Sequence, residues 1–244
     1  MLTIKDFHET FIDSGMLRDF SVEGCEGLHL WVSDDLETVW RWCERLPGAV
    51  GATPPYWVAV WPSGQALARF MVENAAHLAG ARVLDLGTGG GVCAIAAARS
   101  GAARVVAVDI DPLACAATQF NANANGVEVH TVCVDVLGED QEDFDLIVAA
   151  DLWYERFLAQ RVSTWLKAQS RKGTRVWIGD SGRAYFPREG LGLMAQYRVG
   201  ASAHLESAPE VTVGIYSLSV STQTTCASGM HRVHGIPHPK SPLV

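Results

Sequence analysis

The sequence has no long hydrophobic run. Although 48% of its 244 residues are hydrophobic, no segment approaches the roughly 20 consecutive apolar residues that span a bilayer. The first residues, M-L-T-I-K-D-F-H-E-T-F, carry acids early and lack the apolar core of a secretory leader and the Arg/Ser-rich pattern of a transit peptide. We therefore expect a soluble cytoplasmic protein with no membrane contact.

Paired cysteines and basic clusters are also missing. The six cysteines include no C-x-x-C pair and no metal-ligand spacing, so we expect reduced thiols that pack as small hydrophobes and no metal site. The net charge of −8 argues against nucleic acid as a partner, because phosphate binding needs a basic face. The acids are concentrated in residues 1–50, where they form either a solvated face or a surface that attracts a basic protein substrate.

A regular alternation of strand and helix patterns begins at residue 82. It predicts a Rossmann-like α/β fold, in which a seven-stranded, mostly parallel sheet ends in an antiparallel pair and carries helices on both faces. The expected strands are 82–85, 104–109, 129–134, 144–150, 174–179, 194–204 and 211–221, and the expected helices between them are 92–100, 112–125 and 155–170.

The chain divides into three parts in this interpretation. Residues 1–50 form an N-terminal extension, with a short strand at 28–32 and a helix that Asp34 or Asp35 caps and that runs to Leu46. Residues 51–221 form the main domain, including a helix that starts at Ser63 or Gly64. Residues 222–244 are rich in Gly, Pro and His and contain no acid, which predicts a disordered tail.

The turn after the first strand of the alternation carries the most specific chemistry. It reads D-x-G-x-G-x-G, with Asp85 followed by Gly87, Gly89 and Gly91. The glycines let a ligand approach the backbone, and with Ala94 they also satisfy a dinucleotide fingerprint. Asp85 would repel a pyrophosphate and would suit the ammonium of S-adenosyl-L-methionine. A phosphate loop is excluded because no Gly-Lys-Ser/Thr follows. The alternative is that Asp85 only caps the turn.

Further acids follow the next two strands. Asp109 ends the second strand, where a carboxylate can accept both ribose hydroxyls, as it also does in NAD enzymes. Asp135, after the third strand, is placed to accept from an adenine amino group or to serve as a plain turn aspartate.

The fourth strand delivers D-L-W-Y, residues 151–154, to the same edge of the sheet. Methyl transfer to an amine needs a neutral nitrogen, a straight approach and little water. Asp151 could orient the amine, and Trp153 and Tyr154 could wall a lysine channel through cation–π contacts. The alternative is that Asp151 caps the next helix and that the two aromatics belong to the core.

Three motifs carry a family resemblance. The segments P-Y-W-V-A-V-W-P-S-G-Q-A-L-A-R (55–69), D-L-W-Y (151–154) and I-G-D-S-G-R-A-Y-F-P-R (178–188) resemble those of class I protein-lysine methyltransferases, most closely the bacterial type that modifies the electron transfer flavoprotein β subunit. The resemblance covers about 28–221. The chain departs from it at Ser63 and Ser181, which concerns substrate choice rather than fold.

The resemblance implies that Trp61 covers the S-adenosyl-L-methionine cofactor and that Asp151 and Tyr154 are the signature pair. Asp180, Gly182 and Arg183 match the family's D-x-G-R, in which the arginine could bind an acidic substrate group or Asp180. The predicted function is therefore protein-lysine N-methylation, with the electron transfer flavoprotein β subunit as the implied substrate. The alternatives are a small-molecule amine N-methyltransferase, a non-catalytic S-adenosylmethionine-binding protein and, more remotely, an NAD oxidoreductase.

Overall fold

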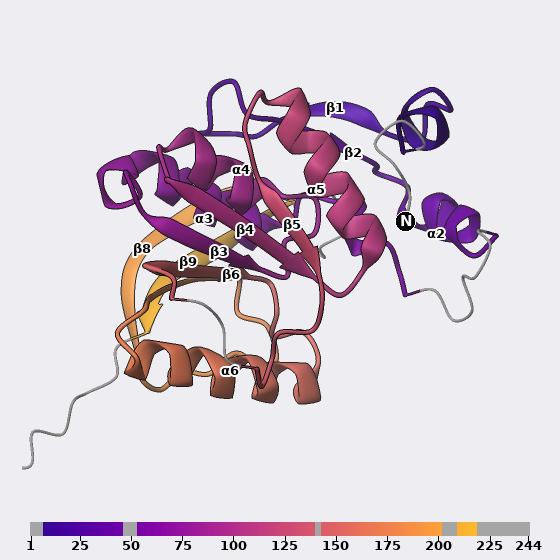
Figure 1. Ribbon diagram of the computed structural model, residues 1–244. Helices are drawn as coiled ribbons and strands as arrows, with labels where there is room; N and C mark the ends of the chain where they lie inside the picture. Colours follow the sequence, from indigo (N-terminus) through magenta and orange to yellow (C-terminus); the bar gives the residue numbers. More distant parts are fainter. Residues whose placement is uncertain (1–6, 46–52, 140–142, 202–208, 219–244) are drawn as a thin grey trace, which may run out of the picture.

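The computed structural model describes residues 7–45, 53–139, 143–201 and 209–218. Seven strands form one sheet in the order β5-β4-β3-β6-β7-β9-β8 (Figure 1). The pairs among β5, β4, β3, β6 and β7 are parallel, and β9 is antiparallel to both β7 and β8. The predicted sheet, including its antiparallel edge pair, is confirmed. The strand bounds are β3 Arg82–Leu86, β4 Arg104–Asp109, β5 His130–Cys133, β6 Leu146–Ala150, β7 Arg175–Asp180, β8 Leu191–Gly200 and β9 Glu210–Leu218.

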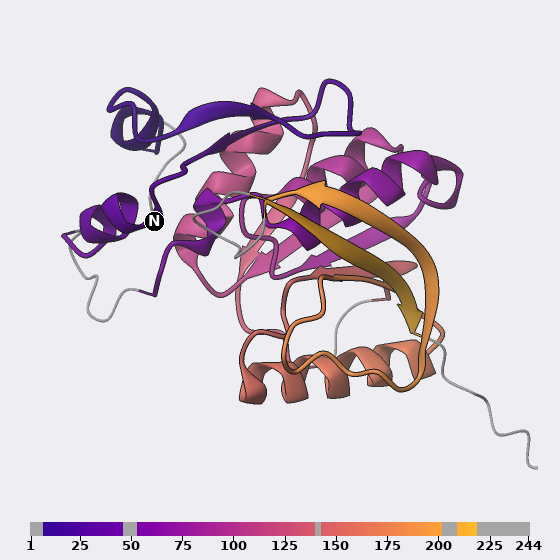
Figure 2. The same cartoon turned by 180° about the vertical axis from the view of Figure 1, so that it is seen from behind.

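Helices cover both faces of this sheet. Helices α3, α4 and α5 lie on one face and α6 lies on the other (Figures 1 and 2). Their bounds are α3 Pro62–Glu73, α4 Val92–Arg99, α5 Pro112–Ala124 and α6 Arg156–Arg171, with a short 3-10 turn η3 at Ala75–His77. The central strands β3, β4, β6 and β7 are nearly continuous apolar runs because both of their faces are buried. One apolar core therefore forms under α3 and α4, and a second forms under α6.

Local capping sets where the helices begin. The Asp111 carboxylate accepts from the Leu113 N–H at the start of α5, and Glu155 accepts from the N–H groups of Phe157 and Leu158 at the start of α6. Gly91 adopts a left-handed φ of 91° as the residue before α4. Strands β3, β4 and β6 each run through a short turn into a helix, which brings these turns together at one edge of the sheet.

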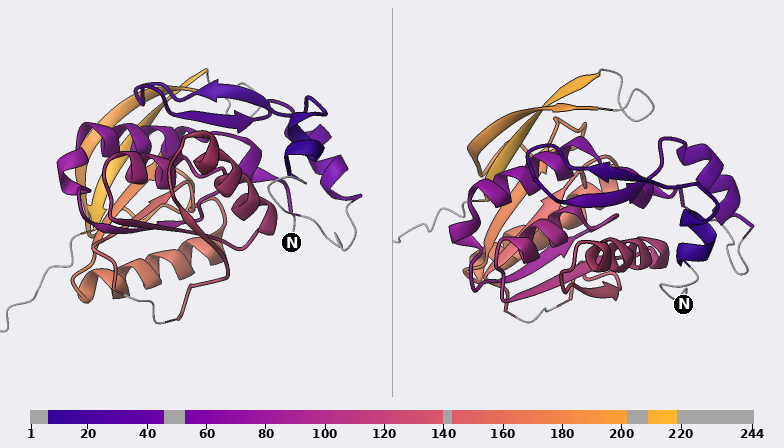
Figure 3. Two further views of the ribbon diagram at one scale, coloured as in Figure 1. Left: turned by 45° about the horizontal axis from the view of Figure 1, so that its top comes forward. Right: turned by 90° about the horizontal axis from the view of Figure 1, so that it is seen from above.

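The N-terminal part packs on the helices rather than on the sheet. Strands β1 (Arg18–Ser21) and β2 (His29–Val32) form an antiparallel hairpin over the face that carries α3, α4 and α5 (Figure 3). The other elements are η1 (His8–Ile12), α2 (Leu36–Cys43) and the 3-10 turn η2 (Tyr56–Val58). An aromatic cluster that includes Phe7, Phe11 and Trp57 joins η1 and η2 to α5.

Two of the predictions concern segments that the structure does not describe. The division after residue 50 falls within 46–52, and the expected disordered tail lies in 219–244. Asp35 does cap α2, since its carboxylate accepts from the Thr38 N–H, and the described helix ends at Cys43. Within the described ranges, none of the helices has both the length and the apolar character needed to cross a bilayer.

Candidate cofactor and substrate site

A cavity of about 480 Å³ opens at the carboxyl ends of β3, β4 and β6. This volume lies in the range of small-molecule sites, and the position is where open parallel sheets bind their ligands. Seven of the ten predicted site residues line it, namely Trp61, Gly87, Gly89, Asp109, Asp135, Asp151 and Tyr154. The other three, Asp85, Gly91 and Trp153, do not line it.

The glycine turn forms the floor of the cavity. Gly87 and Gly89 have φ angles of 68° and 55°, in the left-handed region that other residues rarely adopt. A Cβ atom on Gly87 would also lie 2.6 Å from Cδ2 of Leu152, which lines the cavity beside it. Gly91 sits behind the turn, where a Cβ atom would meet Thr118 at 3.0 Å. Close packing against Thr118 therefore explains why position 91 is a glycine.

Asp85 is buried directly behind the turn. Its Oδ2 accepts from the Thr88 hydroxyl at 2.8 Å and from the Ala94 N–H at 3.0 Å. These contacts are the capping role that the sequence left open. No described residue hydrogen-bonds the second oxygen, Oδ1. Burial raises the pKa of Asp85 to about 7, and the charge of neighbouring Asp109 adds to this rise.

Asp109 and Asp135 reach the cavity from the ends of β4 and β5. Asp109 Oδ2 accepts from the Gly89 N–H at 3.0 Å, its Oδ1 accepts from the Asp111 N–H, and burial raises its pKa. Asp135 accepts from the Leu137 N–H and pairs with Arg161 at 2.7 Å. Both Asp135 oxygens therefore already have protein partners, and the predicted adenine contact would use a remaining lone pair.

Asp151 follows β6 in a strained conformation. Its φ of 54° is the only positive value among the described non-glycine residues. The side chain points away from α6, since Oδ2 accepts from the Ser63 N–H at the start of α3. Oδ1 pairs with Arg183 Nε at 2.9 Å. Burial raises the pKa of Asp151, while the guanidinium and the Ser63 contact act in the opposite direction.

Arg183 links Asp151 to the aromatic wall of the cavity. The Arg183 guanidinium lies 5.6 Å from the centre of the Trp61 ring, so this indole already holds a cation. The sequence argument did not name Asp151 as the partner of the Arg183 side chain. Asp180 accepts from the backbone N–H groups of Gly182 and Arg183, and burial raises its pKa to about 6.

The two aromatic residues of D-L-W-Y have opposite environments. Tyr154 lines the cavity, is 50% exposed and lies 5.8 Å from the ring of Tyr56. Trp153 is 0% exposed, packs in the core under α6 and donates from Nε1 to the Ser163 hydroxyl. The prediction that Trp153 walls the channel is wrong, because its side chain points to the core side of the loop.

Leu152 and Tyr56 are among the cavity residues that were not predicted from the sequence. Leu152 lines the floor against Gly87, and Tyr56 stands at the mouth, where its carbonyl accepts from the Trp61 Nε1–H at 2.9 Å. The only signal was their position inside the motifs 55–69 and 151–154. Neither residue type alone indicates a ligand.

The donors and acceptors present fit S-adenosyl-L-methionine. Asp85 and Asp109 are two nearby carboxylates whose pKa values are raised by burial, so a cation placed between them would be stabilised. Most of the remaining lining is apolar or aromatic, which suits a thioether chain and a purine. Asp85 and the backbone of the glycine turn are the groups that would hold the amino acid end.

Comparison with known proteins agrees with this fit. A family model described as ribosomal protein L11 methyltransferase (PrmA) matches residues 66–170. The electron transfer flavoprotein beta subunit lysine methyltransferase of Danio rerio is 42% identical over 159 residues, which cover 63% of this chain and 62% of that protein. The protein of the same name from Mus musculus is 46% identical over 134 residues, 54% of this chain and 52% of that protein. The chain thus spans little more than half the length of these relatives.

A solved structure shows the same fold. Magnesium protoporphyrin IX methyltransferase from Synechocystis PCC 6803 with bound SAH superposes with a TM-score of 0.50 at 15% identity, over 76% of this chain and 96% of that one. Over about 60% of its length the chain is related to class I S-adenosylmethionine-dependent methyltransferases. Within that class it is related to the electron transfer flavoprotein beta subunit lysine methyltransferases and to the ribosomal protein L11 methyltransferases.

Proposed function

We propose that this protein is an S-adenosyl-L-methionine-dependent protein-lysine N-methyltransferase. The observation that carries the proposal is the position of Asp151. This buried carboxylate projects into the cavity beside the exposed ring of Tyr154, on the same edge of the sheet as Asp85 and Asp109. The names of the matched relatives support lysine as the acceptor.

At the cofactor end, the proposed contacts follow from charge and donor type. Asp85 would accept from the ammonium group through Oδ1, and Asp109 would accept from the ribose hydroxyls. Asp135 would accept from the adenine amino group, and Trp61 would cover the ligand. The backbone of Gly87 and Gly89 allows the ligand to approach closely.

At the substrate end, the chain offers an acceptor for a cationic amine. The bound cofactor would supply the methyl group of its sulfonium. A neutral nitrogen would attack the methyl carbon, and the thioether would leave. A lysine ammonium has a pKa near 10.4 in water, so it must lose a proton before it reacts. Asp151, whose ionised form is favoured by Arg183 and by the Ser63 N–H, would orient the amine. The Tyr154 ring would face it as a π surface.

The cavity mouth suits a protein surface. Tyr56, Tyr154, Phe157 and Tyr185 are all exposed, and the Arg156 guanidinium lies 5.7 Å from the centre of the Tyr185 ring. Exposed aromatic and arginine side chains are enriched in protein interfaces. The electron transfer flavoprotein β subunit is the first substrate to test, on the names of the relatives.

The test is intact-protein mass spectrometry after incubation with S-adenosyl-L-methionine. Unmethylated electron transfer flavoprotein is one substrate, and a lysate from a strain that lacks this gene is the second. The Asp151→Asn variant is the matched control. Methyl gain on a β-subunit lysine with the wild type alone supports the proposal. If only another protein is methylated, that protein takes the place of the electron transfer flavoprotein β subunit as the assigned substrate. If only small amines are methylated, the protein-lysine assignment is overturned.

A further inference from the structure

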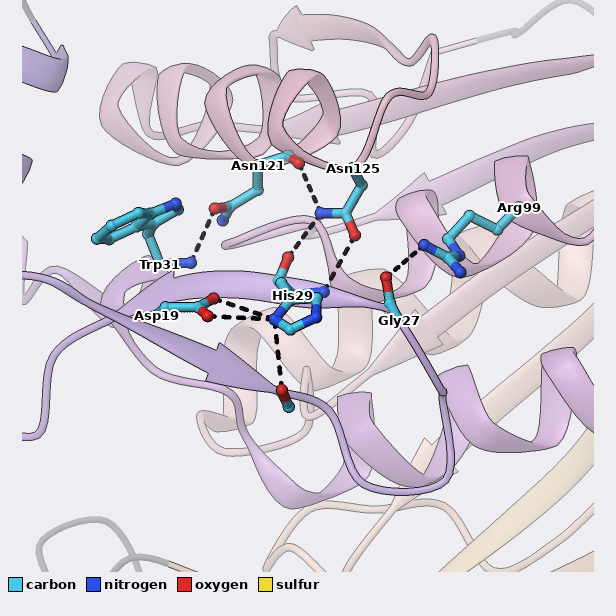
Figure 4. Close-up of polar contacts among 8 residues, drawn as sticks. Asp19, Gly27, His29, Trp31, Arg99, Asn121 and Asn125 are labelled. Carbon is cyan, nitrogen blue, oxygen red and sulfur yellow. Dashed lines mark hydrogen bonds and ion pairs between the residues drawn. The ribbon is translucent and has the colours of Figure 1, made fainter.

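The buried side chain of Asn121 connects the N-terminal hairpin to the glycine turn. Asn121 lies in the last turn of α5 and is 1% exposed. Its Oδ1 accepts from the Trp31 N–H of β2 at 2.9 Å, and its Nδ2 donates to the Gly90 carbonyl at 2.8 Å. Figure 4 shows the side chain reaching from α5 toward β2. A backbone donor on one side and a backbone acceptor on the other fix the orientation of the amide.

A second residue of α5 holds the neighbouring peptide group. The buried Thr118 hydroxyl donates to the Gly89 carbonyl at 2.9 Å. The Gly89 N–H points the other way and donates to Asp109 Oδ2. The turn is therefore held from behind by α5 and from the cavity side by Asp109. None of these hydrogen bonds joins two strands of the sheet, so they hold the turn rather than the sheet.

We propose that Asn121, assisted by Thr118, is a positioning residue for the cofactor. Its amide holds the Gly90 carbonyl away from the cavity and ties the turn to β2, so that the N-terminal hairpin keeps the floor of the site in its binding conformation. This inference rests on the proposed function, because it concerns the site assigned there to S-adenosyl-L-methionine. Asn121 itself does not line the cavity.

The substitution Asn121→Asp tests the donor specifically. The new carboxylate can still accept from the Trp31 N–H, but when ionised it faces the Gly90 carbonyl with an acceptor instead of a donor. We expect the affinity for S-adenosyl-L-homocysteine to fall roughly tenfold or more at pH 8, since an unmade buried hydrogen bond weakens the conformation that binds. At about pH 5.5, protonation would restore a donor, and the deficit in affinity relative to the wild type at the same pH should shrink.

Asn125→Asp is the matched control. Asn125 caps the same helix and faces the same strand, where Oδ1 accepts from the His29 N–H and Nδ2 donates to the His29 carbonyl (Figure 4). The substitution removes an amide donor from the backbone carbonyls of His29 in β2 and of Asn121, as Asn121→Asp removes one from Gly90. None of the hydrogen bonds found for Asn125 in the described ranges reaches the glycine turn. We expect lower thermal stability and unchanged affinity for S-adenosyl-L-homocysteine.

The experiment is calorimetric titration of S-adenosyl-L-homocysteine into the wild type, Asn121→Asp, Asn125→Asp and Thr118→Val, at pH 8 and pH 5.5. Weaker binding with Asn121→Asp and Thr118→Val, and pH recovery with Asn121→Asp alone, supports the positioning role. Wild-type affinity in Asn121→Asp overturns it. If Asn121→Asp does not fold, the affinity of Thr118→Val for S-adenosyl-L-homocysteine is the test. An affinity equal to that of the wild type would then overturn the positioning role. A wild type that binds no ligand overturns the proposed function as well.

Discussion

The substitution Asp85→Asn should make the protein less sensitive to rising pH. The amide keeps an oxygen that accepts from Thr88 and Ala94, so the capping contacts survive. The variant loses the titration of the carboxyl group at position 85. In the folded protein, burial raises the pKa of Asp85 from its ordinary value of 3.8 to about 7. The folded protein thus holds a proton that the unfolded chain has released, and stability falls as pH rises through this window.

The magnitude follows from the two pKa values. One pKa unit corresponds to about 1.4 kcal/mol, so titration of this single carboxyl removes about 3 kcal/mol from the free energy of unfolding between pH 5 and pH 8. Asp180 also has a raised pKa, but it is present in both proteins and cancels in the comparison, whereas Asp109 enters through its charge interaction with Asp85. The Asp85→Asn variant should therefore gain about 3 kcal/mol relative to the wild type over this range.

Urea unfolding at pH 5, 6, 7 and 8 measures this difference directly. A difference between variant and wild type that stays constant with pH would refute the argument, because it would mean that Asp85 titrates normally. Repeating the series with saturating S-adenosyl-L-methionine tests the proposed ligand. A cation beside Asp85 would favour its ionised form and flatten the pH dependence of the wild type. An unchanged slope would place the ligand's charge elsewhere.

Two further substitutions address the substrate end of the cavity. Asp151→Asn should lower turnover by roughly 10²-fold or more while S-adenosyl-L-homocysteine still binds. The reason is that the amide keeps the Ser63 contact but cannot orient an ammonium. Near wild-type turnover would show that the substrate site is misassigned. Arg183→Gln removes the group that most lowers the pKa of buried Asp151, so the acid limb of the kcat/KM profile should move to higher pH. An acid limb that does not move would contradict the Asp151–Arg183 pairing.

The alternation from residue 82 to 180 made the parallel sheet predictable. Each of its strands is a short apolar run with punctuation at both ends, and such runs are fixed by burial on two faces. Strand β1 was missed because its residues are mostly exposed and carry no apolar alternation. Its pairing with β2 depends on the helices beneath it, which a local pattern does not report.

The site was predictable to the level of the loops but not of individual side chains. D-L-W-Y marks the right loop, yet nothing local says that Trp153 turns into the core while Leu152 and Tyr154 face the cavity. The Asp151–Arg183 pair joins residues from the ends of different strands, so only the fold sets it. Asn121 and Thr118 lie in a helix of small residues, and their roles appear only through contacts with the glycine turn.

We assign the cavity at the ends of β3, β4 and β6 to S-adenosyl-L-methionine. The most direct test of this assignment is calorimetric titration of S-adenosyl-L-homocysteine into the wild type, Gly87→Ala and Gly80→Ala. Gly80 has a φ of 73°, close to the 68° of Gly87, but a Cβ atom there meets nothing within 4 Å, so both variants bear similar backbone strain. Binding by the wild type and Gly80→Ala, with loss in Gly87→Ala, is the predicted result. Equal binding by all three proteins, or binding of NADH in place of this ligand, would contradict the claim.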